Sequence, residues 1–217
     1  MIAMILAAGR GERLRPITDT TPKAMVSVRG QPLIDRHLHM LAAAGMNTVV
    51  INLGWLGEQI AEHIGSGSSY GLQVVYSPEY DNILETGGGI HRALPMLGND
   101  PFWVVNADIF TAWHPPAADL QDDAIGELVL VPNPAHKERG DFGLEDGWIS
   151  NNGSRSYTFS GIARYRPEFF ADAESGRYSI VPMMRAAADA GTLSGSLYEG
   201  LWEDVGTAAR LQQLNSR

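Results

Sequence analysis

Cysteine is absent from this sequence of 217 residues. Its absence excludes disulfide bonds, thiolate metal sites and a thiol nucleophile, and it agrees with a reducing compartment such as the cytoplasm. No stretch approaches the roughly 18 consecutive apolar residues of a membrane span, and the first residues predict a strand rather than a secretory signal. We therefore expect a soluble, cytoplasmic protein without a membrane partner.

Positive charge is also scarce. The chain carries 16 Lys and Arg residues against 25 Asp and Glu residues, a formal net charge of −9. This balance argues against a nucleic-acid partner, because such binding requires a basic surface that displaces counterions from the phosphate backbone. Four of the 16 basic residues nevertheless lie within fourteen positions: Arg10, Arg13, Arg15 and Lys23. This local concentration in an acidic protein can direct an anionic substrate to one site.

The basic cluster lies in a glycine-containing loop behind the apolar run Ile2–Leu6. Because Gly9 and Gly11 lack Cβ atoms, backbone N–H groups there can approach phosphate oxygens, and the basic side chains can neutralise the remaining charge. The loop lacks the Gly-Lys-Ser/Thr ending of a Walker loop and the third glycine of the dinucleotide fingerprint. An ordinary turn explains the glycines but not the Pro22 that fixes the backbone before Lys23. We interpret the loop as a polyphosphate site.

Short apolar runs alternate with segments of helical spacing in the first half of the chain. The runs predict strands at Ile2–Leu6, Thr48–Asn52, Gln73–Ser77 and Phe102–Asn106, and the spacing predicts helices from Ile34 to near Gly45 and from about Leu56 to Ile64. This alternation is typical of βαβ units. We expect the α/β class: a single Rossmann-like domain over residues 1–217, with a mixed, mainly parallel central sheet flanked by helices.

The pattern changes after Asp108 to hairpins and isolated strands. The segment 132–157 is rich in Gly, Asn, Asp and Ser, and Asp146-Gly147 is a tight-turn dipeptide between two short strands. We expect a small hairpin and lid region there, which forms a pocket wall. The chain should then return to the sheet at Thr158–Arg164 and end in a helix at Thr207–Leu214.

Two aspartates follow predicted strands far apart in the sequence. Asp108 comes after Val-Val-Asn-Ala, at the carboxyl end of a strand where open α/β sheets bind ligands, and Asp204 comes after Leu-Trp-Glu. Magnesium is usually held by one or two carboxylates together with phosphates and waters, so this pair suffices if the fold brings the two together. For either residue alone, a helix N-cap or turn role is equally open.

At this point the motifs indicate a family. The segment from Leu6 to Lys23 resembles the signature loop of the sugar-1-phosphate nucleotidyltransferases, which join a nucleoside triphosphate to a sugar phosphate and release pyrophosphate. The resemblance implies catalytic roles for Arg13, Lys23 and Asp108, Mg²⁺ as cofactor, and Asp108 and Asp204 as its ligands. It also implies that the loop binds the nucleotide through Leu6, Ala7, Ala8, Gly9, Gly11, Arg13 and Lys23. Residues 1–110 would form mainly the nucleotide-binding half and residues 111–217 mainly the sugar-binding half.

Three successive glycines follow Thr86, although each costs roughly 1 kcal/mol relative to alanine in a helix. One explanation is a loose first helical turn capped by Thr86. The other, implied by the resemblance, is that the backbone approaches the nucleoside there. Candidates around base and ribose are Asn52, Glu79, Glu85, Thr86 and Gly87. A strand-end asparagine such as Asn52 is equally typical of a simple turn.

The stretches Asp-Phe-Gly at 141–143 and Tyr-Thr-Phe-Ser-Gly at 157–161 resemble the family's sugar-contacting segments. The candidate sugar-binding residues are Asn106, Gly143, Thr158, Ser160 and Gly161. Hexose-specific members carry Glu-Lys-Pro between these stretches, whereas this chain has Asn-Asn-Gly-Ser-Arg at 151–155. No residue matches the sugar-phosphate lysine of that string.

Loss of the family's glutamate makes room for an acidic sugar substituent such as a 3-O-lactyl group, which that carboxylate would repel. Together with this loss, the resemblance implies UTP and N-acetylmuramate 1-phosphate as substrates, in peptidoglycan recycling. Arg139 or Arg155 are candidates for the lactyl carboxylate, with solvated surface arginines as the alternative. Guanylyl transfer to mannose 1-phosphate, transfer to another hexose, a glycosyltransferase and a non-catalytic nucleotide-sugar sensor remain alternative functions. The sequence indicates no oligomeric state.

Overall fold

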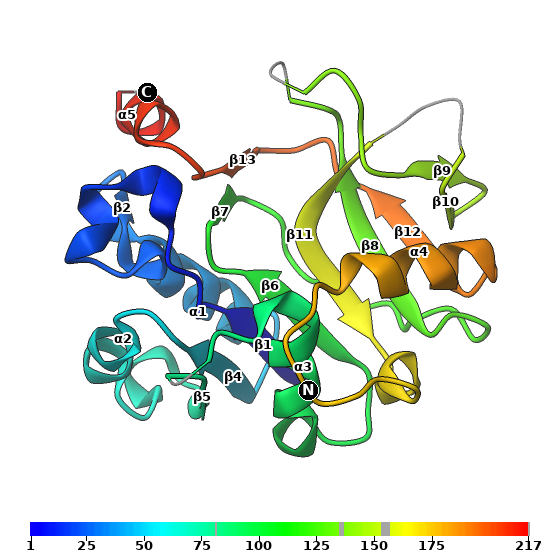
Figure 1. Ribbon diagram of the computed structural model, residues 1–217, viewed down its shortest axis with the longest axis horizontal. Coiled ribbons are helices and arrows are strands. Elements are labelled where there is room, and N and C mark those ends of the chain that lie inside the picture. Colours follow the sequence, from blue (N-terminus) through cyan, green and yellow to red (C-terminus); the bar gives the residue numbers. More distant parts are fainter. Residues whose placement is uncertain (81, 135–136, 153–156, 217) are drawn as a thin grey trace.

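The computed structural model describes residues 1–80, 82–134, 137–152 and 157–216. Its centre is a nine-stranded sheet in the order β5-β4-β1-β6-β11-β8-β12-β10-β9 (Figure 1). The strands are β1 (Ile2–Leu6), β4 (Thr48–Leu53), β5 (Gln73–Pro78), β6 (Phe102–Asn106), β8 (Gly126–Val131), β9 (Gly143–Glu145), β10 (Trp148–Ser150), β11 (Thr158–Tyr165) and β12 (Leu193–Leu197). Shorter pairs join β2 (Ser27–Val28) to β3 (Gln31–Pro32) and β7 (Ile109–Thr111) to β13 (Trp202–Asp204).

The sheet is mixed but mainly parallel, as predicted. Strands β5, β4, β1 and β6 run parallel to one another, and β12 runs parallel to β8. Within the described chain, β11 and β10 are antiparallel to their sheet neighbours and oppose the direction of the other seven strands. The four predicted strands of the first half are confirmed, with β4 and β5 each one residue longer than expected.

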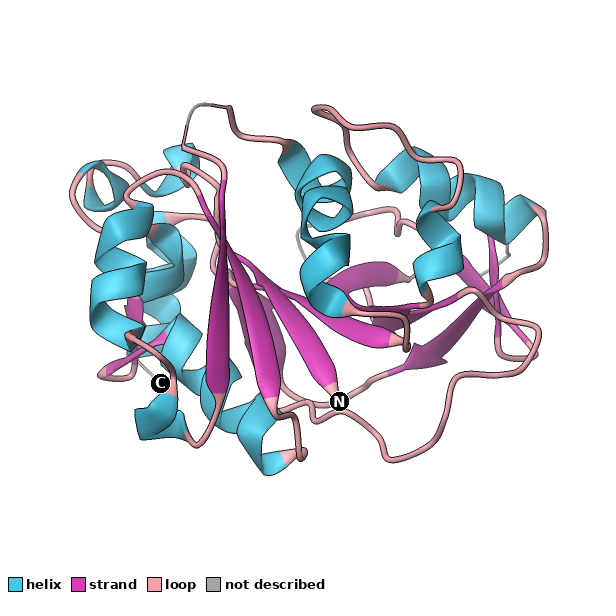
Figure 2. Cartoon of the chain, turned by 90° about the horizontal axis from the view of Figure 1, so that it is seen from below, coloured by secondary structure: helices cyan, strands magenta, loops and turns pink. Residues whose placement is uncertain are grey.

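Helices cover both faces of the sheet (Figure 2). They are α1 (Leu33–Ala43), α2 (Gly57–Ile64), α3 (Glu85–Leu97), α4 (Val181–Asp189) and α5 (Ala208–Asn215), with 3₁₀ turns at Glu12–Leu14, Ile17–Asp19, Lys23–Met25, Ser68–Tyr70 and Pro167–Phe170. Ile5 of β1 shares a core cluster with Leu38 of α1 and Ile60 of α2, whereas the preceding Met4 shares another with Ile90 of α3. Burial on both faces explains why the strand is apolar without alternation.

Three helix ends lie close to the positions that the sequence predicted. α1 stops before Gly45, whose φ of 79° requires a residue without a Cβ. α2 begins after Leu56, and the hydroxyl of Thr207 accepts from the Arg210 N–H to cap α5. Thr86 is not an N-cap: α3 starts at Glu85 without a side-chain cap. None of the helices in the described part of the chain is both long and apolar enough to cross a bilayer.

The hairpin predicted around Asp146 and Gly147 is present, with φ of 48° and 83° at the two turn residues. β10 also pairs with β12, so this hairpin forms the edge of the main sheet rather than a separate lid. A third core cluster joins the N-terminal loop to the C-terminal helix, through Leu14, Val205 and Leu211 among others. In Figure 1, α5 accordingly lies close to the β2 region, at the opposite end of the sequence.

Candidate active site

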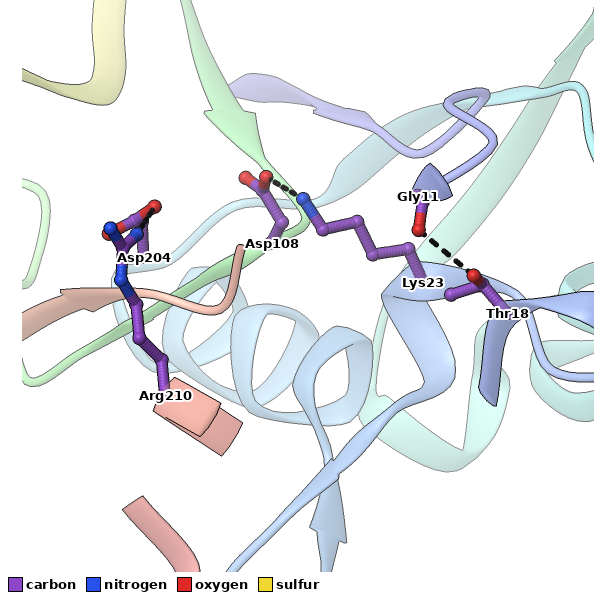
Figure 3. A network of polar contacts seen from close by, with 6 residues as sticks. All are labelled: Gly11, Thr18, Lys23, Asp108, Asp204 and Arg210. Atoms are coloured by element: carbon purple, nitrogen blue, oxygen red, sulfur yellow. Dashed lines mark hydrogen bonds and ion pairs between the residues drawn. The ribbon is translucent and has the colours of Figure 1, made fainter. Parts of the chain in front are cut away.

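The loop of residues 7–23, called the basic loop below, is held by its own backbone. Gly11 has a φ of 63°, and its carbonyl accepts from the Thr18 hydroxyl at 2.9 Å and from the Leu14 N–H at 2.8 Å (Figure 3). A Cβ on Gly11 would lie 2.9 Å from the Thr18 methyl group and 3.0 Å from Lys23 Cβ. Glycine at this position therefore lets the loop close over Lys23, which points toward Asp108 in Figure 3.

A cavity of about 220 Å³ opens beside the basic loop, at the carboxyl ends of β1, β4 and β6. It brings together ten predicted nucleotide-binding residues: Leu6, Ala7, Ala8, Gly9, Gly11, Lys23, Asn52, Glu79, Glu85 and Thr86. Arg13 and Gly87 do not line it, whereas Asn106 and Asp108 do. The sequence singled out most of this wall, but it gave no sign of Ile83, which is also part of it.

Asn52 and Glu79 are almost fully buried in the wall of this first cavity. The Asn52 amide accepts from the Ala7 N–H at 2.7 Å and donates to Glu79 at 2.9 Å. The other Glu79 oxygen accepts from the Leu84 N–H at 2.9 Å. These side chains therefore fix the start of the basic loop and the entry to α3, and Asn52 is not a simple turn former.

The glycines at the start of α3 make room for another part of the protein. A Cβ on Gly88 would lie 2.0 Å from the Gly176 carbonyl oxygen, and one on Gly87 would lie 2.4 Å from the Tyr178 ring. The N–H groups of both glycines donate to the Tyr178 carbonyl. The Thr86 hydroxyl accepts from the Ile180 N–H at 3.0 Å. The segment 176–180 therefore supports the wall of the first cavity from behind, which the sequence did not indicate.

Asp108 and Asp204 lie next to each other, although they are 96 positions apart in the sequence (204 − 108). β7 and β13 pair so that Asp204 stands opposite Ile109, and the Val205 N–H donates to the Asp108 carbonyl at 2.8 Å. Lys23 forms an ion pair with Asp108, and Arg210 forms one with Asp204 (Figure 3). The fold thus meets the condition on which the predicted metal site depended.

Arg13 lies on the Asp204 side of this pair. A Cβ on Gly206 would lie 2.8 Å from the Asp204 carboxylate, 3.3 Å from the Arg210 guanidinium and 3.4 Å from the Arg13 guanidinium. A cavity of about 340 Å³ beside Gly206 is lined by residues of the basic loop: Arg10, Gly11, Glu12, Arg13 and Lys23. Positive groups of the basic loop and of α5 therefore converge around one carboxylate, which suits a highly charged anion.

His37 lies beneath the turn that carries Asp108. The side chain is buried, and burial lowers the pKa of its imidazole to about 4, while backbone hydrogen bonds at Ala107 and Ile109 oppose that shift. The imidazole is therefore neutral near pH 7 and adds no positive charge under the aspartate.

A second cavity of about 200 Å³ adjoins the first. Asn106 and Asp108 line both cavities, so the two meet at the end of β6. Four predicted sugar-binding residues line the second cavity: Asn106, Thr158, Ser160 and Gly161. Gly143 does not, because it pairs with Ser150 inside the β9–β10 hairpin.

The hydroxyl groups on this wall are engaged within the protein. Thr158 donates to the Asn133 side chain at 2.9 Å, and Ser160 donates to the Val129 carbonyl at 2.7 Å. Gly161 has a φ of 81° in the bulge of β11, and a Cβ there would lie 2.7 Å from the Asn106 amide nitrogen. Gly161 therefore makes room for Asn106, which stands between the two cavities.

Sequence reasoning missed Lys137 and Trp202, which also line the second cavity, whereas Asp141 belongs to the stretch 141–143 that it singled out. Nothing near Lys137 in the sequence distinguishes it from a surface lysine. Arg139 is exposed and does not line the cavity, and Arg155 lies outside the described residues.

Comparisons with known proteins agree with this geometry. A sequence model described as nucleotidyl transferase matches residues 2–144, and the chain belongs to this family. The chain is 48% identical to an N-acetylmuramate alpha-1-phosphate uridylyltransferase from Neisseria meningitidis serogroup B, covering 98% of this chain and 96% of the relative. It is 34% identical to the enzyme of the same name from Caulobacter vibrioides, covering 94% and 91%.

Among solved structures, a Bacillus anthracis protein in complex with sucrose superposes with a TM-score of 0.84 at 21% identity, covering 100% of this chain and 94% of that one. The inositol-1-phosphate CTP transferase from T. maritima superposes with a TM-score of 0.78 at 18% identity, covering 99% and 94%. At this identity the structures confirm the α/β fold.

Proposed function

We propose that this chain joins UTP and N-acetylmuramate 1-phosphate to give UDP-N-acetylmuramate and pyrophosphate. The observation that carries the proposal is the meeting of two cavities at Asn106 and Asp108, one bordered by the basic loop and the other by β11 and the Asp204 strand. Two anionic substrates can enter from the two sides and react where the cavities join. The full-length relatives named above support uridylyl transfer to N-acetylmuramate phosphate.

The chemistry is an in-line displacement in which an oxygen of the sugar phosphate attacks the α-phosphorus of UTP and pyrophosphate leaves. A phosphate monoester has a second pKa of about 6, so it is already mostly dianionic at pH 7 and needs no general base. Catalysis then consists of holding two anions together and stabilising charge on the departing pyrophosphate. Lys23 and Arg13 supply that positive charge from the basic loop.

Mg²⁺ is the cofactor that fits the residues present. Asp108 and Asp204 offer two carboxylates that line the same cavity, and no group of three or more His, Asp or Glu side chains suited to a metal occurs within the described ranges. Magnesium commonly uses one or two carboxylates and completes its shell with phosphates and waters. When bound, the ion would neutralise phosphate charge and orient the reacting groups.

The division of the chain into two functional halves is part of the proposal. The first cavity is built from the basic loop, from the ends of β1, β4 and β6, and from the segment 79–86, all before residue 110. The second cavity is built mainly from residues 134–204. We propose that the first takes the nucleotide and the second takes the sugar.

A pyrophosphate-release assay tests the function. Each of the four common nucleoside triphosphates is combined with N-acetylmuramate, N-acetylglucosamine, glucose and mannose 1-phosphates in the presence of Mg²⁺. We expect UTP with N-acetylmuramate 1-phosphate to give the highest kcat/KM and EDTA to abolish turnover.

The other outcomes identify the alternatives. GTP with mannose 1-phosphate as the fastest pair would replace the substrates while keeping the reaction class. Turnover of a nucleotide sugar without pyrophosphate release would indicate a glycosyltransferase. No turnover with any pair would indicate a nucleotide-sugar sensor. Calorimetry would then detect the binding of a nucleotide sugar to the protein.

A further inference from the structure

Lys137 is the only lysine or arginine that lines the second cavity in the described part of the chain. The same wall carries three carboxylates, those of Asp108, Asp141 and Asp204. A hexose phosphate whose sugar ring carries no charged substituent needs positive charge only near its phosphate group. A sugar with a carboxylate of its own would also meet these aspartates at close range, where like charges repel strongly in a partly buried site. Such a substrate needs a second cation away from the reacting phosphates.

The loop that carries Lys137 is attached to β11 at both ends. At its start the Asn133 side chain accepts from the Thr158 hydroxyl at 2.9 Å. At its end one Asp141 oxygen accepts from the Phe159 N–H at 2.9 Å. Between these two anchors, the Lys137 N–H donates to the Pro134 carbonyl at 2.9 Å. The backbone of Lys137 is therefore positioned by the sheet.

The ammonium group of Lys137 is held by Asp141, but this contact does not use all of its hydrogen-bond donors. It lies 2.6 Å from the Asp141 oxygen that also accepts from Phe159, and the lysine side chain is 32% exposed. An ammonium has three N–H donors, so two remain for a ligand while the Asp141 contact persists. Asp141 thus orients Lys137 for a further anion without having to move.

The position of Lys137 separates its role from that of Lys23. Lys23 lines the first cavity and pairs with Asp108, where the phosphates react. Lys137 lines the second cavity and does not line the first. We propose that Lys137 binds the carboxylate of the sugar's acidic ether substituent and thereby selects an acidic N-acetylhexosamine phosphate over a neutral one. This inference rests on the function proposed above.

The test compares two substrates that differ only in the lactyl ether, N-acetylmuramate 1-phosphate and N-acetylglucosamine 1-phosphate. For Lys137→Met we expect KM for the muramate substrate to rise about 10-fold or more, as for loss of a charge-assisted hydrogen bond. We expect kcat for that substrate to change by less than about two-fold, and KM for the glucosamine substrate to remain unchanged, because its phosphate contacts are untouched. Lys137→Arg should retain the preference for muramate.

Arg139→Met is the matched control, because Arg139 is an exposed cation of the same loop that does not line the cavity. It should leave both KM values unchanged. Equal losses with both sugars in Lys137→Met would assign Lys137 to the phosphate or to folding and overturn the inference. If Lys137→Met kept the wild-type preference for the muramate substrate, the inference would also be overturned, while the proposed function would remain intact. A wild-type enzyme that does not prefer muramate would instead refute the proposed function, and this inference with it.

Discussion

Asp204 forms its ion pair with Arg210, which lies six residues further along the chain in the first turn of α5. Thr207 caps that helix, and Leu211 and Leu214 anchor it in the core cluster that contains Leu14 of the basic loop. The arginine therefore approaches the carboxylate from a fixed helix. Arg210 thus occupies the electrostatic position that we propose for a divalent cation.

The first prediction follows from this competition. Arg210→Met should strengthen divalent-metal binding by up to about five-fold, because a partly exposed ion pair is worth up to about 1 kcal/mol. Binding of Mn²⁺, as a spectroscopic substitute for Mg²⁺, can be titrated by electron paramagnetic resonance without nucleotide. Arg92→Met removes an exposed arginine of α3 and should leave the affinity unchanged. Weaker binding in Arg210→Met would show that the arginine supports the metal-bound form instead.

The second prediction concerns Lys23. Lys23→Ala should lower kcat by about 100-fold or more, the usual effect of removing one key electrostatic contact to a transition state. Because Lys23 also pairs with Asp108, thermal unfolding must be measured on the same sample. A stable variant with near-normal kinetics would refute the catalytic role. Asp108→Asn should give a loss of similar size, accompanied by weaker metal binding.

The third prediction compares two positions at which glycine is needed for different reasons. Among the described residues, no atom beyond Gly9 and its two sequence neighbours lies within 4 Å of the position that a Cβ on Gly9 would occupy, whereas a Cβ on Gly88 would lie 2.0 Å from the Gly176 oxygen. Gly88→Ala should therefore lower the free energy of unfolding by about 1–3 kcal/mol, as overpacking does. Gly9→Ala should change it by less than about 0.5 kcal/mol, because nothing in the protein is displaced.

The effect of the Gly9 substitution should appear in nucleotide binding. Gly9 lines the first cavity, where we propose that backbone N–H groups approach the triphosphate. We expect KM for UTP to rise about 10-fold, which corresponds to the loss of one charge-assisted hydrogen bond. A normal KM for UTP in a stable Gly9→Ala protein would place the triphosphate elsewhere.

The sequence predicted the first half of the fold and the place of Asp108 at a strand end for physical reasons that are local. β1, β4 and β6 are buried on both faces, so each is a continuous apolar run that contrasts with the flanking loops. Asp108 directly follows such a run, and the carboxyl end of a parallel strand is where ligands bind. Asp204 follows an apolar run that is too short to predict which strand it pairs with. The prediction that Asp204 lies near Asp108 therefore depended on the family resemblance.

The remaining features depend on contacts that no short segment of sequence contains. β12 includes Ser194 and Gly195, which are untypical of strands, and a Cβ on Gly195 would lie 2.4 Å from the end of the Ile149 side chain. Gly88 faces a segment almost ninety residues later in the chain. Lys137 resembles any surface lysine until β11 anchors its loop. Long-range packing therefore determined what the sequence could not show.

The last prediction concerns Ser160, which the sequence assigned to sugar binding. Its hydroxyl donates to the Val129 carbonyl at 2.7 Å and accepts from the Ile162 N–H at 3.2 Å, within the bulge of β11. Ser160→Ala would remove both of these buried hydrogen bonds and should lower the free energy of unfolding by about 1–3 kcal/mol. Because the hydroxyl is engaged with the backbone, KM for the sugar phosphate should change by less than about two-fold.

Ser196→Ala is the control for this substitution, because Ser196 is an exposed serine of β12 whose hydroxyl donates to Glu127 at 3.1 Å. It should change stability by less than about 0.5 kcal/mol. Urea unfolding measures both variants, and initial rates at varied sugar phosphate give KM. If Ser160→Ala raised that KM about 10-fold with unchanged stability, the hydroxyl would have to leave Val129 to contact the sugar, and the bulge would then be part of the binding reaction.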